Sequence, residues 1–219
     1  MPQAAFSHVT HWVFDLDNTL YPPSARLFDQ IEGRMRAYLM RVLKVNDTEA
    51  DHLRRHYWET YGTTLAGLMR EHQVDPDPFL DDVHDISFDQ LQPDPTLAGL
   101  IRALPGRRIV YTNGTRPYAK QVLTARGLDG IFDAIYGVEH AEYLPKPEQG
   151  AYDRVFGTDN LSGGVAAMFE DEARNLAVPF SMGMRTVHVA PTPQDLHYVD
   201  FHTDDLNGFL GQILGQVQG

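Results

Sequence analysis

The stretch VFDLDNTLY, residues 13–21, decides the fold of this chain. A short apolar run, Trp12–Phe14, ends in two carboxylates, Asp15 and Asp17, which are separated by one residue and followed by small polar residues. In an open α/β sheet, ligands bind where loops leave the carboxyl ends of the strands. Two acids at such a strand end could hold a divalent metal, divide nucleophile and acid/base roles, or do both. The pair alone does not distinguish these roles, so its partners must come from the rest of the chain.

The composition is that of a globular protein with a substantial core. The chain has 219 residues, 42% of them hydrophobic, which fits one domain with a large insertion or a large and a small domain. It has no cysteine, which excludes disulfides, thiolate metal sites and a cysteine nucleophile. Residues 1–11 lack the basic and apolar regions of a secretory signal, and no apolar run approaches the roughly 20 residues that span a bilayer. We therefore expect a cytoplasmic protein without a membrane partner.

The charge balance argues against a nucleic acid polymer as a partner. Lys and Arg number 18 against 30 Asp and Glu, giving a formal net charge of -12, whereas nucleic acid binding relies on a broad basic surface. A small phosphorylated ligand stays compatible with this charge, because a bound metal can override the global field locally. The sequence does not set the oligomeric state.

The second half of the chain alternates between strand and helix patterns. Short apolar runs predict strands at 108–111, 131–135, 165–169 and 186–189. Between and after them, periodic apolar residues predict helices at 96–104, 117–126, 148–156, near Ala173 and at 206–214. Strands that alternate with helices indicate a parallel sheet in an α/β fold, and the run at 12–14 supplies a further strand.

A purely helical block separates the first strand from the others. Apolar residues within 27–42 recur at spacings of three and four, as in an amphipathic helix. Thr48 and Asp51 resemble a capping box at the start of a second helix, and two more helices are predicted at 63–72 and 78–83. No convincing strand appears there.

The helical block is therefore an insertion into the sheet domain. We predict an α/β core formed by residues 1–21 and 92–219, interrupted by a helical domain at residues 22–91. The predicted fold is a Rossmann-like parallel sheet with an inserted all-helical domain.

The second strand ends in residues suited to a phosphate group. Thr112 and Asn113 are followed by Gly114, which permits close approach of a backbone to a ligand, and Pro117 fits the first turn of the next helix. A hydroxyl and backbone amides at a helix N-terminus can bind a phosphate oxygen. The same pattern also occurs in a simple turn with a helix cap, so it gains weight only in combination.

Two later loops complete the pattern. Lys146 lies between two prolines, which restrict the local backbone and favour a rigidly held cation. The strand at 165–169 is followed by Glu170 and Asp171, with Asn175 one helical turn beyond. Four successive strand ends or loops thus present acids, a hydroxyl, a lysine and a second pair of acids.

This combination resembles the four motifs of the haloacid dehalogenase-like superfamily of phosphohydrolases. The motifs occur in order as residues 15–19, Thr112-Asn113, Lys146 and Glu170-Asp171, and the helical insertion resembles the mobile cap of that family. More narrowly, residues 20–22, Thr112-Asn113-Gly114 and Phe169-Glu170-Asp171 with Asn175 look like pyrimidine 5′-nucleotidases.

The resemblance implies a role for each matching residue. Asp15 would attack phosphorus to form an aspartyl-phosphate, and Asp17 would protonate the leaving alcohol and then activate water. Thr112, with its neighbour Asn113, would bind the phosphoryl group, and Lys146 would link that group to the Asp15 carboxylate.

The resemblance also implies a Mg²⁺ cofactor. The ion would be held by Asp15, the Asp17 carbonyl and Asp171, with Glu170 nearby or acting through water. Asn175 departs from relatives that have an acid there, and it would orient Lys146. Clustered carboxylates repel one another without a cation, and an oxygen-only ligand set suits Mg²⁺.

Alternative functions remain at this stage. The first hypothesis is a Mg²⁺-dependent phosphomonoesterase for (pyrimidine) nucleoside 5′-monophosphates, and the alternative is a phosphatase or mutase of the same superfamily for phosphoglycolate or sugar phosphates. Dehalogenases lack the second motif aspartate, so Asp17 argues against them. A response-regulator receiver is rejected, because its motif order differs and it would leave the helical insertion unexplained. Tyr57, Trp58 and Tyr61 could stack on a nucleobase, although aromatic residues at helical spacing more often belong to a core.

Overall fold

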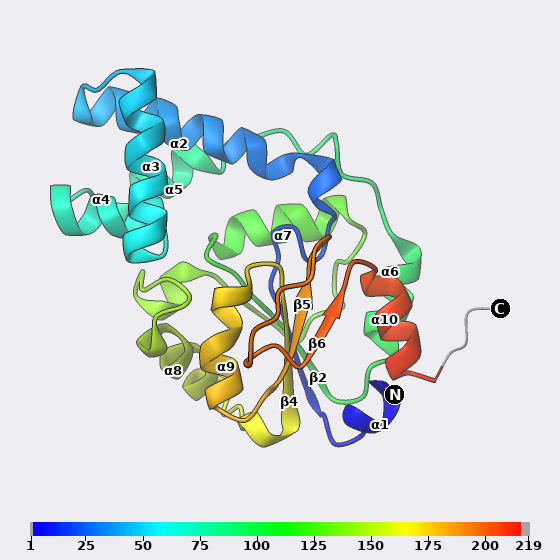
Figure 1. Cartoon of the computed structure of the whole chain (residues 1–219). Helices are drawn as coiled ribbons and strands as arrows, with labels where there is room; N and C mark the ends of the chain where they lie inside the picture. The colour runs from blue at the N-terminus through cyan, green and yellow to red at the C-terminus, as the bar shows by residue number, and fades with distance from the viewer. Residues whose placement is uncertain (1, 216–219) are drawn as a thin grey trace.

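A six-stranded parallel sheet forms the centre of the molecule (Figure 1). The computed structural model describes residues 2–215. The strand order is β3-β2-β1-β4-β5-β6, so the first strand lies in the middle. The strands are β1 His11–Phe14, β2 Arg107–Tyr111, β3 Ala134–Tyr136, β4 Ala166–Glu170, β5 Arg185–Val189 and β6 Phe201–Thr203.

Helices flank this sheet and fill the segments between its strands. Those of the sheet domain are α1 Pro2–Ala5, α6 Pro95–Ala103, α7 Arg116–Ala125, α8 Gln149–Thr158, α9 Ala177–Ser181 and α10 Leu206–Ile213. Short 3₁₀ segments occur at η1 Pro23–Ala25, η2 Val138–Ala141, η3 Gly163–Val165 and η4 Ala173–Leu176.

The central strands are buried on both faces, as their continuous apolar character requires. Phe14 of β1 stacks on Phe169 of β4, with ring centroids 4.6 Å apart, in the core that includes α6, α7 and α10. Its neighbour Val13 points to the other face and joins Met168 and α8 in a second core. Because Phe14 pairs in register with both Val110 and Phe169, the three strands end at the same edge of the sheet.

Four helices form a separate group above that edge (Figure 1). They are α2 Leu27–Leu43, α3 Asp47–Tyr61, α4 Thr64–His72 and α5 Pro76–Val83, and the described range 22–91 contains no strand. The predicted fold class, a Rossmann-like parallel sheet with an inserted all-helical cap, is confirmed. The predicted boundaries of the two domains stay a prediction.

Some local predictions were wrong. The helix α3 is capped by Asn46, whose side chain accepts from the Glu49 amide at 3.0 Å, so Thr48 is not the cap. The strand β6 was not predicted, because three half-buried residues leave little pattern in a sequence. Among residues 2–215, no helix combines the length and apolar character needed to cross a bilayer.

One buried arginine joins the two linkers between the sheet domain and the cap. Arg126, 8% exposed, donates from Nε to the Leu20 carbonyl at 3.1 Å and from a terminal nitrogen to the Gln92 carbonyl. Its other terminal nitrogen donates to Asp94 at 3.0 Å, and Asp94 caps α6. Arg126 therefore holds the two linkers between the sheet domain and the cap next to each other.

Candidate active site

The carboxyl ends of β1, β2 and β4 bring the predicted residues to one place. Asp15 follows β1, and its amide continues the pairing with β4 by donating to the Phe169 carbonyl at 2.8 Å. Thr112 follows β2, and Glu170 ends β4. Parallel strands that end in register place these side chains at the same edge, where Lys146 reaches them from a loop.

Lys146 is the buried centre of the charge network. Only 1% exposed, it donates from Nζ to Asp15 Oδ1 at 2.7 Å, to Glu170 Oε2 at 2.6 Å and to the Tyr111 carbonyl at 3.1 Å. Burial by itself would lower the pKa of Lys146, but the charges of Asp15 and Glu170 outweigh it and raise that pKa above its usual value. The lysine is therefore a fixed cation beside Asp15.

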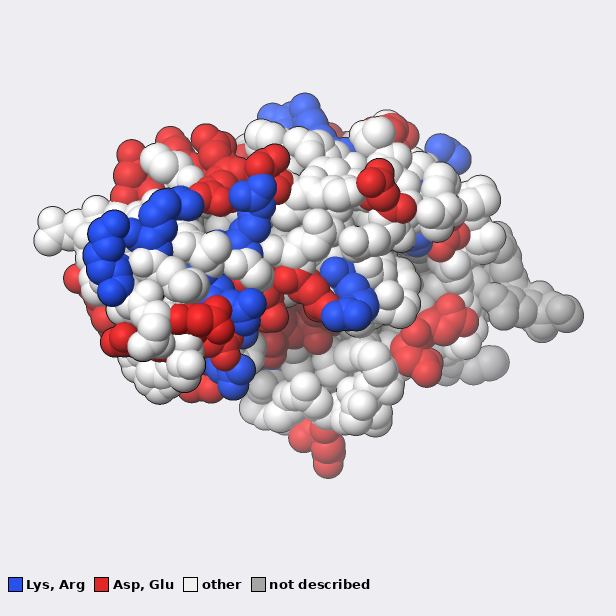
Figure 2. Space-filling model, turned by 90° about the horizontal axis from the view of Figure 1, so that it is seen from above, with Lys and Arg blue, Asp and Glu red and all other residues white. Residues whose placement is uncertain are grey.

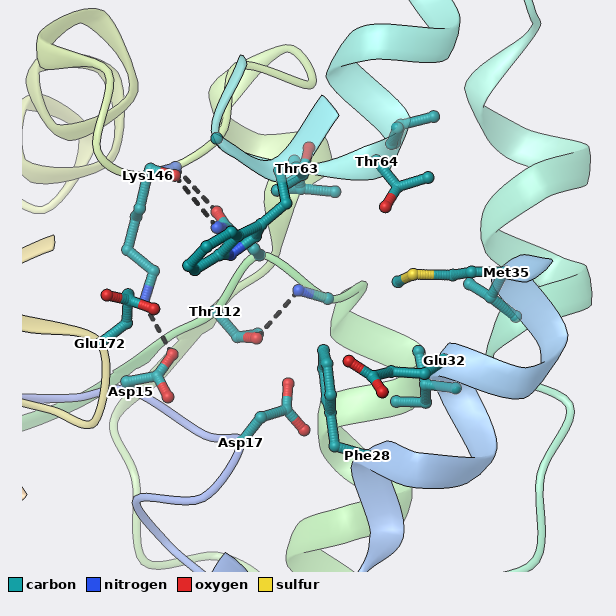
Figure 3. A pocket seen from close by; sticks show the side chains of 18 of the residues that line it. Asp15, Asp17, Phe28, Glu32, Met35, Thr63, Thr64, Thr112, Lys146 and Glu172 are labelled. Atoms are coloured by element: carbon teal, nitrogen blue, oxygen red, sulfur yellow. Dashed lines mark hydrogen bonds and ion pairs between the residues drawn. The ribbon is translucent and has the colours of Figure 1, made fainter. Parts of the chain in front are cut away.

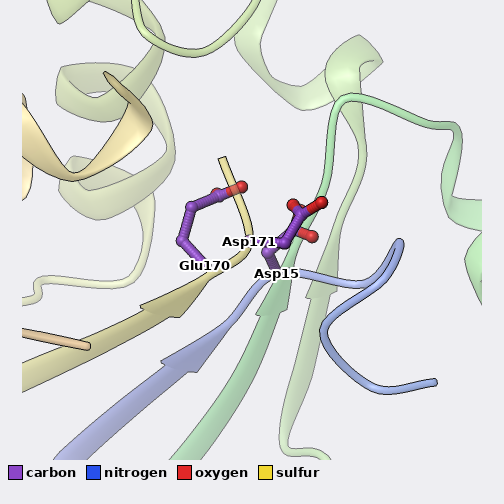
Figure 4. A group of neighbouring side chains, drawn as sticks. All are labelled: Asp15, Glu170 and Asp171. Atoms are coloured by element: carbon purple, nitrogen blue, oxygen red, sulfur yellow. The ribbon is translucent and has the colours of Figure 1, made fainter. Parts of the chain in front are cut away.

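Three carboxylates meet beside that cation. Asp15, Glu170 and Asp171 each offer an oxygen, and these oxygens lie within 4.8 Å of one another (Figure 4). Burial, followed by the charge of Glu170, raises the pKa of Asp15 to about 7. Burial and then the charges of Asp15 and Glu170 also raise the pKa of Asp171. A divalent cation would relieve this repulsion, and the oxygen-only donor set suits Mg²⁺.

The hydrogen bonds distinguish the three carboxylates. Both oxygens of Glu170 are engaged, Oε2 by Lys146 and Oε1 by the Asn175 amide at 3.1 Å. Asp171 Oδ2 accepts from Asn18 at 3.3 Å. Among the described residues, no lysine, asparagine or hydroxyl donor is assigned to Asp15 Oδ2 or Asp171 Oδ1. Asp171 Oδ1 is therefore the better candidate for direct metal contact.

Asp17 is held by two tyrosines. Its Oδ1 accepts from the hydroxyl of Tyr118 at 2.6 Å and from that of Tyr21 at 2.8 Å. Burial, followed by the charge of Asp15, raises the pKa of Asp17 to about 6, although both phenols oppose the shift. A carboxyl group with a pKa near neutrality is suited to general acid and base catalysis.

Thr112 lines the cavity beside Asp15, and its binding of a phosphate group stays a prediction. Its hydroxyl is buried, accepts from the Gly114 amide at 2.9 Å and lines the same cavity as Asp15 (Figure 3).

Asn113 makes a different contact from the predicted one. Its side-chain oxygen accepts from the Lys146 amide at 2.8 Å, and its nitrogen donates to the Lys146 carbonyl at 3.2 Å. This geometry favours a role in fixing the lysine loop, and the phosphate-binding role of the Asn113 side chain stays a prediction.

Asn175 reaches Lys146 only through Glu170, whereas a direct role in orienting the lysine was predicted. Its amide donates to Glu170 Oε1, and Glu170 in turn accepts from Lys146. Any influence of Asn175 on Lys146 therefore passes through Glu170. The Asn175 main chain is itself fixed, because its carbonyl accepts from the Tyr152 hydroxyl at 2.6 Å.

A cavity of about 430 Å³ extends from these groups to the cap (Figure 3). The sheet domain supplies its polar end, with Asp15, Asp17, Thr112 and Lys146. The opposite wall is mostly apolar and comes from the cap, with the residues Phe28, Ile31, Met35, Leu65, Phe79, Leu80 and Val83. In Figure 3, Glu32 of α2 also points into this space. The cavity can thus hold a phosphate group at one end and an organic group at the other.

The aromatic residues of α3 separate into core and cavity wall. Tyr57 is fully buried, and its hydroxyl contacts His72 Nε2 at 2.7 Å. Trp58 lines the cavity and is 42% exposed, and the guanidinium of Arg174 lies 3.9 Å from its ring centroid. Arg174 also donates to the Trp58 carbonyl at 2.9 Å, so it joins the cap to the sheet domain.

The sequence did not indicate the contacts of Tyr118 and Arg174. Tyr118 lies 101 positions from Asp17, and Arg174 lies 116 positions from Trp58. Both residues occur in ordinary helical segments, so no local signal could have identified them. Tyr21 belongs to the opening motif, but its hydroxyl contact was not foreseen.

A family model places the chain among known hydrolases. The model of the haloacid dehalogenase-like hydrolase family matches residues 10–178, which include β1, the cap and β4. The chain belongs to this family. It is 27% identical over 202 residues to phosphate metabolism protein 8 of Saccharomyces cerevisiae, covering 84% of this chain and 62% of that protein. The chain thus spans under two thirds of that relative's length.

Solved structures of the haloacid dehalogenase-like family share the fold. A HAD phosphatase from Thermococcus onnurineus matches 96% of this chain and 100% of its own, with a TM-score of 0.63 and 18% identity. YfnB from Bacillus subtilis, bound to magnesium, matches 94% and 99% with a TM-score of 0.64 and 15% identity. An L-2-haloacid dehalogenase from Xanthobacter autotrophicus matches 95% and 100% with a TM-score of 0.59 and 15% identity. At these identities the likeness shows the fold alone.

The surface seen from the cap side carries both signs of charge. Figure 2 shows basic side chains interspersed with acidic ones over this face, without a broad basic area. Ion pairs such as Arg54–Glu32 and Arg70–Glu148 neutralise part of the basic charge of the described residues. The absence of a nucleic acid partner stays a prediction, and the mixed charge of this face is compatible with it.

Proposed function

We propose that this hydrolase is a Mg²⁺-dependent phosphomonoesterase that acts through an aspartyl-phosphate intermediate. The observation that carries the proposal is the pairing of Asp15 Oδ1 with buried Lys146, while no side chain of the described residues donates to Asp15 Oδ2. One carboxylate oxygen is thus fixed and the other is available to attack. The proposal gains support from the name of the yeast relative, which refers to phosphate metabolism.

The two-step reaction follows from the residues present. Asp15 Oδ2 attacks phosphorus as the bond from phosphorus to the ester oxygen breaks, and Asp17 transfers its proton to that oxygen. Water then attacks the phosphoryl group and gives a proton to Asp17, as the bond between phosphorus and the Asp15 oxygen breaks. This step releases inorganic phosphate and restores the Asp15 carboxylate and the Asp17 carboxylic acid.

Lys146 and the metal site address the main barrier to this attack. Two unit charges of the same sign about 4 Å apart repel by about 4 kcal/mol at an effective dielectric constant of about 20. Lys146 lies at 2.7 Å from Asp15 and offsets part of that repulsion. A Mg²⁺ ion, held by Asp15 and Asp171 with the Asp17 carbonyl and with Glu170 nearby, would supply further charge stabilisation.

Asp17 favours phosphate ester hydrolysis over dehalogenation. An alcohol leaving group must receive a proton, whereas a halide leaves as a stable anion without one. The Asp17 carboxyl lines the same cavity as Asp15 and has a raised pKa, as a proton donor requires. A solved dehalogenase shares the fold, but the fold does not determine the chemistry.

For the substrate we propose a nucleoside 5′-monophosphate, with a pyrimidine base preferred. The cavity of about 430 Å³ has a polar end for phosphate and an apolar cap wall that suits a flat ring. The polar groups of Glu32 and Arg54 also line this wall, and they could bind the edge of a base. The alternative is phosphoglycolate or a sugar phosphate, which would use the polar side chains of the cap wall and leave its apolar residues without a partner.

A substrate screen with Mg²⁺ tests this assignment. We expect UMP, CMP or dUMP to be hydrolysed with higher kcat/KM than phosphoglycolate or hexose phosphates. Turnover of the sugar phosphates with inert nucleotides would reject the nucleotidase and keep the phosphatase.

Replacement of the nucleophile tests the mechanism. Asp15→Asn keeps the shape of the side chain but removes its charge, and we expect kcat to fall by more than about a thousandfold. The exposed Asp89→Asn serves as a control and should keep full activity. Robust Mg²⁺-dependent turnover by folded Asp15→Asn protein would reject the nucleophile assignment.

A further inference from the structure

One oxygen of the Asp17 carboxylate is saturated by two buried phenols. Tyr118 and Tyr21 are each 1% exposed, and their hydroxyls lie 2.6 Å and 2.8 Å from Asp17 Oδ1. A carboxylate oxygen has two lone-pair sites, so two donors fill Oδ1. Among the described residues no hydrogen bond is made by Asp17 Oδ2. The two oxygens of one side chain are therefore chemically distinct.

The two phenols approach Asp17 from different parts of the fold. Tyr21 lies in the first linker to the cap, four positions after Asp17. Tyr118 lies in the first turn of α7, and its ring stacks on His84 of the cap with centroids 4.3 Å apart and an angle of 10° between planes. Asp17 is thus fixed from both the cap linker and the sheet domain.

The glycine of the Thr112-Asn113-Gly114 turn makes room for Tyr118. A Cβ at Gly114 would lie 2.8 Å from Tyr118 Cδ1, closer than carbon atoms pack. The need for glycine here thus comes from the tyrosine ring. The same turn that presents Thr112 to the site also lets Tyr118 reach Asp17.

We propose that Tyr21 and Tyr118 are positioning residues that hold Asp17 so that its Oδ2 carries the catalytic proton. This inference rests on the proposed phosphatase function. Donors on Oδ1 stabilise negative charge there and direct a proton to the other oxygen. The proton then passes from Oδ2 to the ester oxygen as the bond to phosphorus breaks, and it is recovered from water in the second step.

A pair of substrates isolates this role. Benzyl phosphate releases an alcohol that needs a proton, whereas 4-nitrophenyl phosphate releases a stable phenolate that needs little help. For Tyr118→Phe we expect kcat/KM to fall by about tenfold to a hundredfold with benzyl phosphate and by less than about threefold with 4-nitrophenyl phosphate. Phenylalanine keeps the ring that stacks on His84, so the packing is preserved.

Tyr136→Phe is the matched control. The Tyr136 hydroxyl donates to the carboxylate of Asp159 at 2.7 Å, away from the cavity. This variant therefore also loses a phenol hydroxyl that donates to an aspartate, but at a site that does not line the cavity. Its kcat/KM should be unchanged with both esters. Equal losses on both esters in Tyr118→Phe would overturn the positioning role, since a structural defect would not depend on the leaving group.

A second measurement does not depend on activity. Buried tyrosine hydroxyl protons exchange slowly, and NMR of protein with ¹³Cζ-labelled tyrosine can detect them. In Asp17→Ala, the hydroxyl signals of Tyr21 and Tyr118 should shift while that of Tyr136 stays constant. Unchanged Tyr21 and Tyr118 signals would overturn the inference. If the wild type hydrolysed neither ester with Mg²⁺, the proposed function would fail, and these signals would still decide whether the phenols hold Asp17.

Discussion

Asp15 makes the proposed metal site sensitive to pH. In the protein without metal, burial and then the charge of Glu170 raise the pKa of this carboxyl to about 7, against an ordinary value near 3.9. The Asp171 carboxyl is shifted in the same direction, for the same kinds of reason. Below pH 7 the Asp15 carboxyl therefore binds a proton that a cation would have to displace, and the raised pKa of Asp171 acts in the same sense.

The affinity for Mg²⁺ should therefore fall as the pH decreases through 7. A raised pKa means that the proton competes with the cation below that value, and metal binding then releases protons. Calorimetry in two buffers of different ionisation enthalpy would measure both the affinity and the number of protons released. A constant affinity without proton release on both sides of pH 7 would contradict this prediction.

The folding stability should also depend on pH, because of His84. Burial lowers the pKa of His84 to about 4, whereas a histidine in an unfolded chain has a value near 6.5. Between these values the unfolded state binds more protons than the folded state. Stability contributed by the neutral ring is present above about pH 6.5 and is lost as the pH falls toward 4.

Replacing His84 by Gln should flatten this profile. The wild type should lose up to about 3 kcal/mol more stability than His84→Gln between pH 7 and pH 4. The buried carboxyls of the site act in the opposite direction, but they are present in both proteins and cancel in the comparison. Urea unfolding at several pH values measures the difference, and parallel profiles would show that His84 does not titrate as stated.

At the level of elements, the contact between α3 and α4 depends on one glycine. A Cβ at Gly67 would lie 2.2 Å from Cγ of Tyr57, which is fully buried. In an exposed helix, replacing glycine by alanine is favourable by up to about 1 kcal/mol. Here the steric conflict with the Tyr57 ring outweighs that gain.

Gly67→Ala should destabilise the protein by about 1–3 kcal/mol, as overpacking does. Gly33→Ala is the matched control, because Gly33 lies within the cap helix α2 and a Cβ there meets nothing within 4 Å. That variant should be as stable as the wild type or more so. The midpoints of denaturant unfolding measure the stability of both variants. Equal changes in midpoint would show that the Tyr57 ring does not set the distance between α3 and α4.

The sequence predicted elements where local periodicity is strong. The helix α2 and the strands β1 and β4 follow from apolar spacing within single segments, and the residues at the ends of those strands follow with them. The strand β6 could not be predicted, because it is stabilised by parallel pairing with β5 (Val187 with Phe201) and has only three residues.

Contacts between segments that are distant in the sequence could not be predicted either. The Asn113 side chain carries the same amide whether it binds a phosphate or the Lys146 backbone, and only the folded loop shows the latter contact. Tyr118 likewise reaches Asp17 only because β2 and β1 are neighbours in the sheet. Residue types predicted which side chains gather at the site, whereas the contacts that support those side chains depend on the three-dimensional arrangement.

At the scale of the whole molecule, Arg126 joins the two linkers between the sheet domain and the cap. It bonds to Leu20 and to Gln92, the residues that flank the proposed cap at 22–91, and we retain those boundaries as a proposal. Replacing it by methionine would leave the buried Leu20 carbonyl without its donor, at about 1–3 kcal/mol. It would also remove the hydrogen bond to the Gln92 carbonyl and the ion pair with Asp94.

Arg126→Met should therefore lower stability by about 2–4 kcal/mol and loosen both linkers. Hydrogen exchange should increase at residues 20–23 and 92–94, with little change in the central strands. Arg102→Met, at an exposed position of α6, should leave both measurements unaltered. Increased exchange throughout the sheet would indicate general unfolding and contradict a role confined to the linkers.

The Arg126 contact also bears on how such a protein can diversify. Two of its partners, Leu20 and Gln92, accept through main-chain carbonyls, which every amino acid possesses, so these two contacts do not depend on the side chains at those positions. A different helical segment could be inserted between the same two points and still be held in place. Substrate choice and bond-breaking chemistry can then evolve separately, because the segment that forms the apolar wall is exchangeable while Asp15, Asp17 and Lys146 remain in the sheet domain.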